Sequence, residues 1–233
     1  DWATPMSEIL KENGYHTASF VTNAFAGKTF GLARGFDSHA LKNRAGPQWV
    51  NDQTEKFLAA VDPDKPVFMY LHTLEPHSDY SPEPETWRLF DRGFDGVCDG
   101  SVDGLQEVGG IYPEVEEKDV AYLVDLYDAE IRDNDTGFAN FLQLLKKSGR
   151  YDNSLIIVVA DHGEAFNEHR TLEHGLTLNQ EEMRVPLIVR FPGGRSAGRR
   201  IAAKVSLIDL FPTIMAQAGV KPDLDYPLSG WDL

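Results

Sequence analysis

The chain has 233 residues, of which 42% are hydrophobic and 11% aromatic, and this is enough apolar material to bury one sizeable core. Its formal net charge is −15 and its Lys and Arg residues form no long basic run, which argues against binding to nucleic acid or to an anionic membrane surface. No apolar stretch approaches the roughly 20 residues that cross a bilayer, and a single cysteine excludes an internal disulfide framework. The composition leaves the oligomeric state open.

The first part of the chain alternates helical and strand patterns. Residues 4–15 predict a short helix closed at Gly14, and residues 17–21 (TASFV) predict a strand. Residues 46–61 carry apolar side chains at near-helical spacing, and residues 65–73 (KPVFMYLHT) form an apolar run of strand length. This order of helices and strands is typical of an α/β domain.

A passage without a sustained period follows, from about residue 74 to 114. It is rich in Pro, Gly and Asp, and it is long enough to indicate a functional loop or a local excursion from the domain. Its aromatic side chains could line a pocket or pin the loop to the body of the domain, and both interpretations stay open. These aromatic residues are Trp87, Phe90, Phe94 and Tyr112.

The second part of the chain continues the alternation. Residues 118–147 predict one long amphipathic helix, and residues 154–160 (SLIIVVA) and 185–191 (VPLIVRF) predict two fully apolar strands. Residues 206–219 predict a last helix, which a glycine ends. Because apolar strands without polar alternation are buried on both faces, we expect an α/β fold with a largely parallel sheet sandwiched between helices.

Polar residues follow directly after the strand at 154–160. In open α/β sheets, ligand sites lie beyond the carboxyl ends of the strands, so Asp161 and His162 stand where chemistry is expected. A carboxylate and an imidazole on adjacent residues can share one divalent cation, and Gly163 removes a side chain that would crowd the turn. Taken alone, the motif fits equally a strand-end Asp that caps the next helix, with a surface His beside it.

The segment from 160 to 194, ADHGEAFNEHRTLEHGLTLNQEEMRVPLIVRFPGG, resembles the C-terminal half of the core of the sulfatase family, within the alkaline-phosphatase-like superfamily. Four other segments resemble the family's motifs in the same order, so the likeness covers nearly the whole chain. They are TPMSEILKENGYHTASFVTNAFAGKTFGLARGFD, KPVFMYLHTLEPHSDYSPE, LVDLYDAEIRDND and SLIDLFPTIMAQAG. The resemblance implies an alkaline-phosphatase-like core.

By this resemblance, Asp161 and His162 are metal ligands, and the metal is Ca²⁺ in many sulfatases, with Mg²⁺, Mn²⁺ or Zn²⁺ as alternatives. His77 matches a histidine that contacts the sulfate or protonates the leaving oxygen. His174 stands where many members carry a Lys or His that touches the sulfate. A cation and two imidazoles could neutralise the charge that moves onto the leaving group. A loop histidine at 77 and an exposed helix-entry residue at 174 are the structural alternatives.

The family's nucleophile is a formylglycine made from a Cys or Ser in a C/S-x-P-x-R segment. Cys98 lies in GVCDGSV, which has neither the Pro nor the Arg of that pattern. We therefore expect residues 1–233 to be a fragment of a sulfatase catalytic domain, with an excursion at about 74–114. The nucleophile and a pair of acidic metal ligands would lie N-terminal to the chain, and the small C-terminal subdomain would lie beyond it.

The resemblance implies that the parent protein is a metal-dependent hydrolase of small-molecule or carbohydrate sulfate esters. An exported location, periplasmic or extracellular, is what the family most often implies. Thr22 and Asn23 stand where the family has a GKWH segment, so a phosphodiester or phosphonate monoester hydrolase on the same scaffold is an alternative. A non-catalytic or incomplete fragment is an alternative of another class.

Overall fold

The computed structural model describes residues 3–108, 110–224, 226–227 and 229–233. It divides into two compact units, which are described separately. The first unit comprises Asp1–Leu74, Leu144–Leu155 and Arg190–Leu233, and the second unit comprises Glu75–Gln143 and Ile156–Val189.

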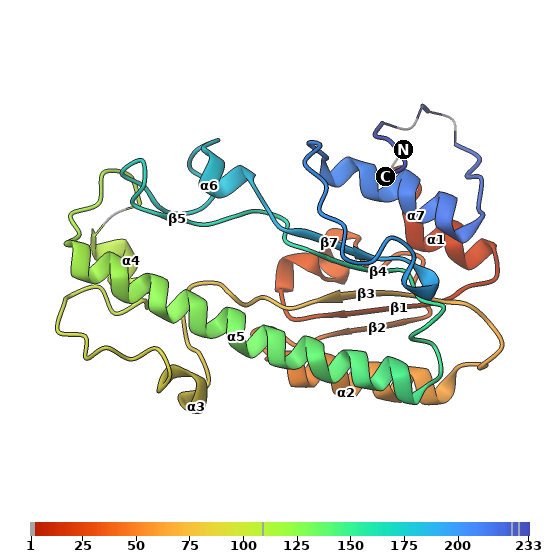
Figure 1. Cartoon of the computed structure of the whole chain (residues 1–233), viewed down its shortest axis with the longest axis horizontal. Helices are drawn as coiled ribbons and strands as arrows, with labels where there is room; N and C mark the ends of the chain where they lie inside the picture. The colour runs from red at the N-terminus through yellow and green to blue at the C-terminus, as the bar shows by residue number, and fades with distance from the viewer. Residues whose placement is uncertain (1–2, 109, 225, 228) are drawn as a thin grey trace. The chain divides into compact units, whose positions relative to one another are not determined.

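A parallel three-stranded sheet forms the centre of the first unit. Its strands are β1 (His16–Val21), β2 (Ser38–Leu41) and β3 (Val67–His72), in the order β2-β1-β3, and Figure 1 shows them side by side. The register places Ala18 between Ser38 and Met69. The predicted strands at 17–21 and 65–73 are thus confirmed, whereas β2 is an additional strand.

Helices cover this sheet on both faces. On one face, α2 (Pro47–Ala60) packs against β1, with the ring of Phe57 edge-on to that of Phe20 at 6.1 Å between centroids. On the other face, α1 (Met6–Glu12) and α7 (Leu210–Ala218) share an apolar cluster that includes Phe68 of β3. Successive side chains of a strand point to opposite faces, so each strand serves both clusters. The predicted α/β fold with a parallel sheet between helices is confirmed.

Four short 3₁₀ helices complete the described residues of the first unit. The predicted helix at 206–219 begins as one of them, because Ser206 and Asp209 form a reciprocal capping box, and it ends at Gly219 in the left-handed conformation. The four are η1 (Ala24–Ala26), η2 (Lys28–Phe30), η3 (Pro192–Gly194) and η4 (Leu207–Asp209).

The second unit is built on α5 (Glu117–Lys147), whose residues up to 143 belong to it. Leu123 of α5 is fully buried, and it joins Tyr80, Leu105 and Leu172 in one apolar cluster. This unit also contains α3 (Pro84–Trp87), α4 (Val102–Val108), the paired strands β4 (Ile156–Val159) and β7 (Leu187–Arg190), the antiparallel hairpin of β5 (Ala165–Phe166) and β6 (Leu172–Glu173), and α6 (Gln180–Met183). The last residue of β7, Arg190, belongs to the first unit.

The irregular passage at 74–114 is held to α5 rather than free. The ring of Phe94 stacks on Tyr122 of α5 at 3.7 Å between centroids, and Trp87 meets the same ring edge-on at 5.4 Å. These two aromatic residues therefore anchor the passage. In the part of the chain that the structure describes, no helix is long and apolar enough to cross a membrane.

Candidate active site

The turn Asp161-His162-Gly163 follows β4 and presents its two polar side chains to solvent. Asp161 is 76% exposed and His162 is 40% exposed, and Asp161 Oδ1 lies 3.7 Å from His162 Nε2. The other ring nitrogen, Nδ1, lies 2.8 Å from the Gly163 carbonyl oxygen and therefore carries the proton of that hydrogen bond. In the neutral ring, Nε2 is then the nitrogen with the lone pair, and it lies 3.7 Å from the carboxylate oxygen.

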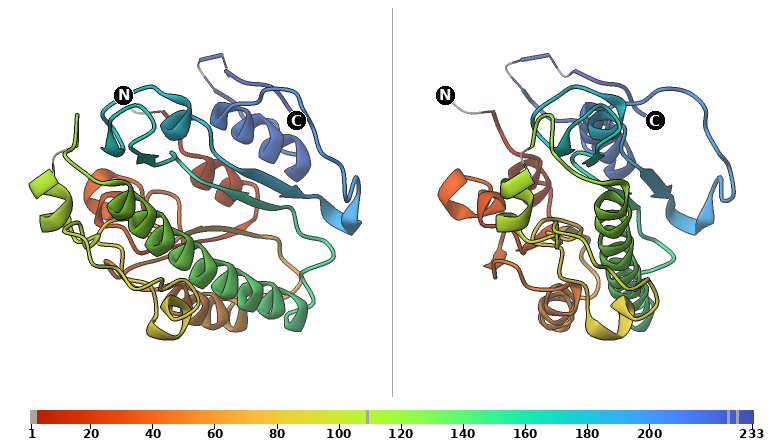
Figure 2. Two further views of the ribbon diagram at one scale, coloured as in Figure 1. Left: turned by 60° about the vertical axis from the view of Figure 1, so that its left-hand side comes forward. Right: turned by 90° about the vertical axis from the view of Figure 1, so that its left-hand side faces the viewer.

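Gly163 fixes this turn against α6. Its N–H donates to the Glu182 carbonyl oxygen at 2.7 Å. A Cβ atom at this position would lie 1.9 Å from the Glu181 carbonyl oxygen, which is far inside van der Waals contact. The glycine is therefore required by the close approach of two main chains, and not by an unusual φ angle. Figure 2 shows α6 next to the segment that contains the turn and the hairpin.

His174 follows β6 and is held by a buried carboxylate. Its Nδ1 lies 3.0 Å from Glu164 Oε1, and the Glu164 side chain is only 4% exposed. This hydrogen bond raises the pKa of His174, and burial of the ring opposes the shift. The ring stacks on that of His162, with 4.0 Å between centroids and 27° between planes. Because His174 is half-buried and begins no helix, the interpretation as an exposed helix-entry residue is wrong.

Glu164 also meets a tyrosine. Burial raises the pKa of Tyr80, and the charge and hydrogen bond of Glu164 raise it further, so the Tyr80 hydroxyl stays a neutral donor to this carboxylate. Tyr80 comes from the irregular passage, whereas Glu164 belongs to the DHGE motif. The sequence offered no signal for this contact, since nothing in it pairs position 80 with position 164.

His77 completes the cluster. Its ring meets His174 edge-on, with 5.1 Å between centroids. Its Nδ1 lies 2.6 Å from the Ser78 carbonyl oxygen, and its main-chain N–H donates to Glu130 Oε2 at 3.0 Å. The neighbouring Ser78 hydroxyl donates to Glu173 Oε1 at 3.0 Å, which ties the His77 segment to the hairpin.

The structure thus brings the four predicted site residues, Asp161, His162, His77 and His174, into one cluster in the second unit. Of the other histidines, His169 forms a surface pair with Glu181, at 2.6 Å between Nδ1 and Oε1. The carboxylates around the cluster were not singled out by sequence reasoning.

The donor set fits part of a metal site. Asp161 Oδ1 and His162 Nε2 are ligand atoms that divalent cations accept, and their separation of 3.7 Å suits two neighbouring positions of one coordination shell. Among the residues that the structure describes, however, no group of three or more His, Cys, Asp or Glu side chains could hold a metal ion. These two residues therefore fit as two ligands of a larger set.

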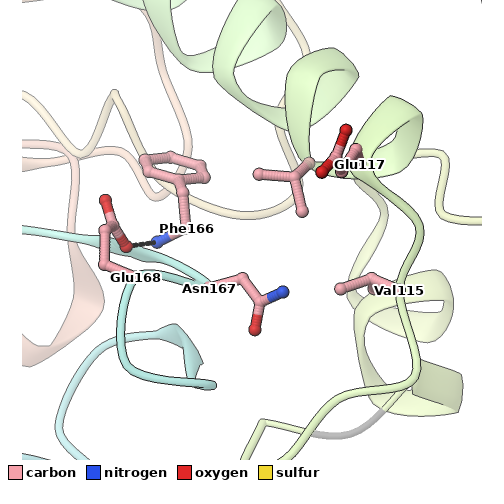
Figure 3. Close-up of a pocket in the computed structure, with 6 residues that line it drawn as sticks. Val115, Glu117, Phe166, Asn167 and Glu168 are labelled. Atoms are coloured by element: carbon pink, nitrogen blue, oxygen red, sulfur yellow. Dashed lines mark hydrogen bonds between the residues drawn. The ribbon is translucent and has the colours of Figure 1, made fainter.

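A hollow lies on the β5–β6 hairpin that leads to His174. It has a volume of about 260 Å³, and Phe166, Val115 and Val120 give it an apolar lining. Asn167 and Glu117 add polar groups, and Figure 3 shows both beside this hollow. Glu168 also lines the hollow, so two carboxylates border it.

Comparison with known proteins identifies the family of the chain. The Sulfatase family model matches residues 2–220. The chain belongs to the sulfatase family. An endo-4-O-sulfatase of Bacteroides thetaiotaomicron is 28% identical to this sulfatase chain over 170 residues, which cover 72% of this chain and 32% of that protein. The sulfatase chain therefore spans about a third of the length of that relative.

Solved structures show the same fold. A phosphonate monoester hydrolase of Agrobacterium radiobacter matches with a TM-score of 0.72 at 20% identity, over 99% of the sulfatase chain and 60% of its own. A protein in complex with its substrate D-glucosamine-2-N,6-O-disulfate matches with a TM-score of 0.70 at 17% identity, over 97% and 63% of the two chains. These matches assign the alkaline-phosphatase-like fold of the sulfatases.

Proposed function

We propose that the protein to which this chain belongs hydrolyses sulfate esters, with Asp161 and His162 holding a divalent cation and with His77 and His174 acting on the ester. One observation carries the proposal. The His174 ring contacts both the His162 ring and the His77 ring, at 4.0 and 5.1 Å between centroids, so the two ligands and the two remaining imidazoles surround one small region.

The hydrogen bonds of the cluster suggest a separate role for each side chain. When bound, the cation would neutralise charge on the sulfate oxygens. His174 donates from Nδ1 to Glu164, and this carboxylate stabilises the imidazolium whose Nε2–H can donate to a sulfate oxygen. His77 donates from Nδ1 to the Ser78 carbonyl, so Nε2 is its free ring nitrogen, and only the imidazolium form of the ring could pass a proton from Nε2 to the departing alcohol oxygen.

A nucleophile from outside this chain is part of the proposal. Cys98 is buried and lacks the surrounding C/S-x-P-x-R pattern. We propose that a formylglycine, supplied by a segment that this chain does not contain, provides the attacking oxygen. The share of the relatives' length that the chain spans, 32% to 63% in the three comparisons, leaves room for such a segment.

The proposed substrate is a sulfated carbohydrate. The comparison protein solved with D-glucosamine-2-N,6-O-disulfate supports this class. The hollow on the hairpin has an apolar wall at Phe166 and polar groups at Asn167, Glu117 and Glu168, which can bind sugar hydroxyl groups, although its two carboxylates would repel a sulfate placed there. An exported location is proposed from family membership alone.

Substitution of Asp161 tests the proposal. In the full-length protein we expect Asp161→Ala to lower kcat/KM for an aryl sulfate by at least about 10³-fold, because the cation loses a ligand that stabilises developing charge. Asp152→Ala is a matched control, since Asp152 is an exposed carboxylate of the first unit. Circular dichroism checks that both variants fold. If kcat/KM of the Asp161→Ala enzyme stayed within threefold of the wild-type value, Asp161 would not be a metal ligand.

A phosphodiester or phosphonate monoester hydrolase is the second candidate. An imidazole ligand at His162 favours zinc-like metals, whereas calcium takes oxygen ligands, and a phosphonate monoester hydrolase shares the fold. Rates on a sulfate ester and a phosphonate ester of the same alcohol, each measured with Ca²⁺, Mg²⁺, Mn²⁺ and Zn²⁺, distinguish the candidates. A higher kcat/KM for the phosphonate with every metal would replace the sulfatase proposal.

A further inference from the structure

Glu130 is a buried carboxylate whose partners are main-chain groups of the His77 segment. It lies in the middle of α5 and is 2% exposed. Its Oε2 accepts the N–H of His77 at 3.0 Å, and its Oε1 accepts the N–H of Ser81 at 2.6 Å. Both oxygens of one rigidly mounted side chain therefore hold the two ends of a five-residue turn.

This arrangement is electrostatically costly. Burial raises the pKa of Glu130 to about 7, the two N–H donors oppose the shift, and the nearby carboxylates of Glu75 and Asp133 add to it. Within the described part of the chain, no Lys, Arg or His forms an ion pair with Glu130. A carboxylate kept in such surroundings needs a reason beyond general stability, because replacing a buried charge by an apolar group is often neutral or favourable.

Neighbouring side chains of α5 hold the flanking parts of the same passage. Asp133 accepts the N–H of Glu83 at 2.8 Å and the hydroxyl of Thr86, and Asn134 donates to the Glu75 carbonyl. The Glu130 contact differs from these because one of its two donors is the amide of His77 itself. The helix therefore offers a test residue at 130 and a matched control at 133.

We propose that Glu130 is a positioning residue, whose carboxylate fixes the main chain at 77–81 so that the His77 imidazole stands edge-on to His174. The inference rests on the proposed function, because the value of placing His77 lies in its proton transfer to the leaving oxygen. The His77 ring has one further restraint, the hydrogen bond from Nδ1 to the Ser78 carbonyl, and that carbonyl belongs to the same turn. Movement of the turn therefore moves the ring and its hydrogen-bond partner together.

The test compares Glu130→Gln with Asp133→Asn in the full-length protein. A glutamine has one acceptor oxygen, and its amide nitrogen would face the second N–H donor, so one anchor of the turn is lost. We expect Glu130→Gln to lower kcat for an aryl sulfate by about 10- to 100-fold with KM changed less than about threefold, because misplacing a catalytic group by an ångström costs on this order. Asp133→Asn should stay within about threefold of wild type.

A second readout does not depend on activity. Hydrogen exchange at the amides of His77 and Ser81 should become at least about 10-fold faster in Glu130→Gln, whereas in Asp133→Asn the change should fall on Glu83. In a His77→Ala background, adding Glu130→Gln should lower kcat by less than about twofold, because residues that act as a unit are not additive. If Glu130→Gln does not fold, Glu130→Asp takes its place in the test. This variant keeps the charge on a shorter side chain, and it should also make exchange at the amides of His77 and Ser81 faster.

Three results would overturn the inference. An unchanged exchange rate at the amides of His77 and Ser81 in a folded Glu130 variant would show that Glu130 does not anchor this turn, whatever the activity of the variant. Faster exchange in Glu130→Gln together with a wild-type kcat would show that Glu130 does not position His77 for catalysis. An equal loss of kcat from Glu130→Gln in the wild-type and His77→Ala backgrounds would show the same. A wild-type protein that hydrolyses neither sulfate nor phosphonate esters would instead refute the proposed function, and the exchange data would still decide the anchor.

Discussion

Gly163 is the residue at which the Asp161-His162-Gly163 turn touches α6. Because a Cβ would lie 1.9 Å from the Glu181 carbonyl oxygen, and a carbonyl cannot swing aside as a side chain can, Gly163→Ala must separate the turn from α6. We expect a loss of about 1–3 kcal/mol in the free energy of unfolding, the usual cost of overpacking, measured by denaturant titration of the full-length protein.

Gly46 offers a control for this substitution. It has an ordinary negative φ, and nothing lies within 4 Å of a Cβ built there, so Gly46→Ala should cost no more than about 1 kcal/mol as the N-cap of α2. Equal losses from the two substitutions would show that contact with α6 does not restrain the turn.

At this scale the sequence predicted part of the candidate site. Asp161, His162, His77 and His174 could be selected because they match motif positions, and the structure places them together. Glu164 and Glu130 could not be selected in this way, because they are two among 37 acidic residues and only a partner distant in the chain marks them as buried. Burial of a carboxylate depends on tertiary contacts that periodicity does not encode.

At the scale of elements, α5 carries acidic side chains that hold part of the 74–114 passage, and one of them, Glu130, gives the protein a pH dependence. The folded pKa of Glu130 is about 7, above its ordinary value, so the folded state binds more protons than the unfolded state between about pH 4.5 and 7. The free energy of unfolding therefore falls as pH rises through this window, by up to about 3 kcal/mol from this group.

Replacing the group separates this contribution from others. Glu130→Gln does not titrate, so its free energy of unfolding should fall less than that of wild type between pH 5 and 7, as measured by urea unfolding at several pH values. Parallel curves for the two proteins would mean that the Glu130 pKa is not raised in the folded state.

Long elements, whose periodic pattern repeats several times, were predictable, whereas short elements were not. The helix expected at 118–147 is α5, because nine apolar positions on one face leave no other pattern. By contrast, β2 and the two-residue strands β5 and β6 are too short to show an alternation. The hairpin that leads to His174 therefore could not be predicted from the sequence, although its residues belong to a segment that resembles a family motif.

At the scale of the whole molecule, the proposed site takes only two of the ligands of a divalent cation, Asp161 and His162, from this chain. Calcium takes 6–8 oxygen ligands, so we expect the 233-residue chain alone to bind Ca²⁺ with a Kd weaker than about 10⁻⁴ M. Isothermal titration calorimetry measures this value. A micromolar Kd would show that further ligands lie within the chain, and it would contradict the proposal that the site is completed from outside it.

The fold class followed from alternating helices and apolar strands, and family membership confirms it. Strand pairing did not follow, because a fully apolar strand carries no mark of its neighbour. The strands expected at 154–160 and 185–191 pair with each other as β4 and β7, while β1 lies between β2 and β3. Which strands meet depends on how connecting segments pack, and that information is spread over the whole chain.

Asp161, His162 and His174 of the candidate site lie in one short stretch of the chain, whereas His77 comes from a segment more than 80 residues away. Closing a long loop costs more conformational entropy than closing a short one, so nearby segments meet first. We expect the Glu164–His174 pair to assemble early and the His77 turn to dock last. Docking of the His77 turn would then be the folding step that completes the catalytic site.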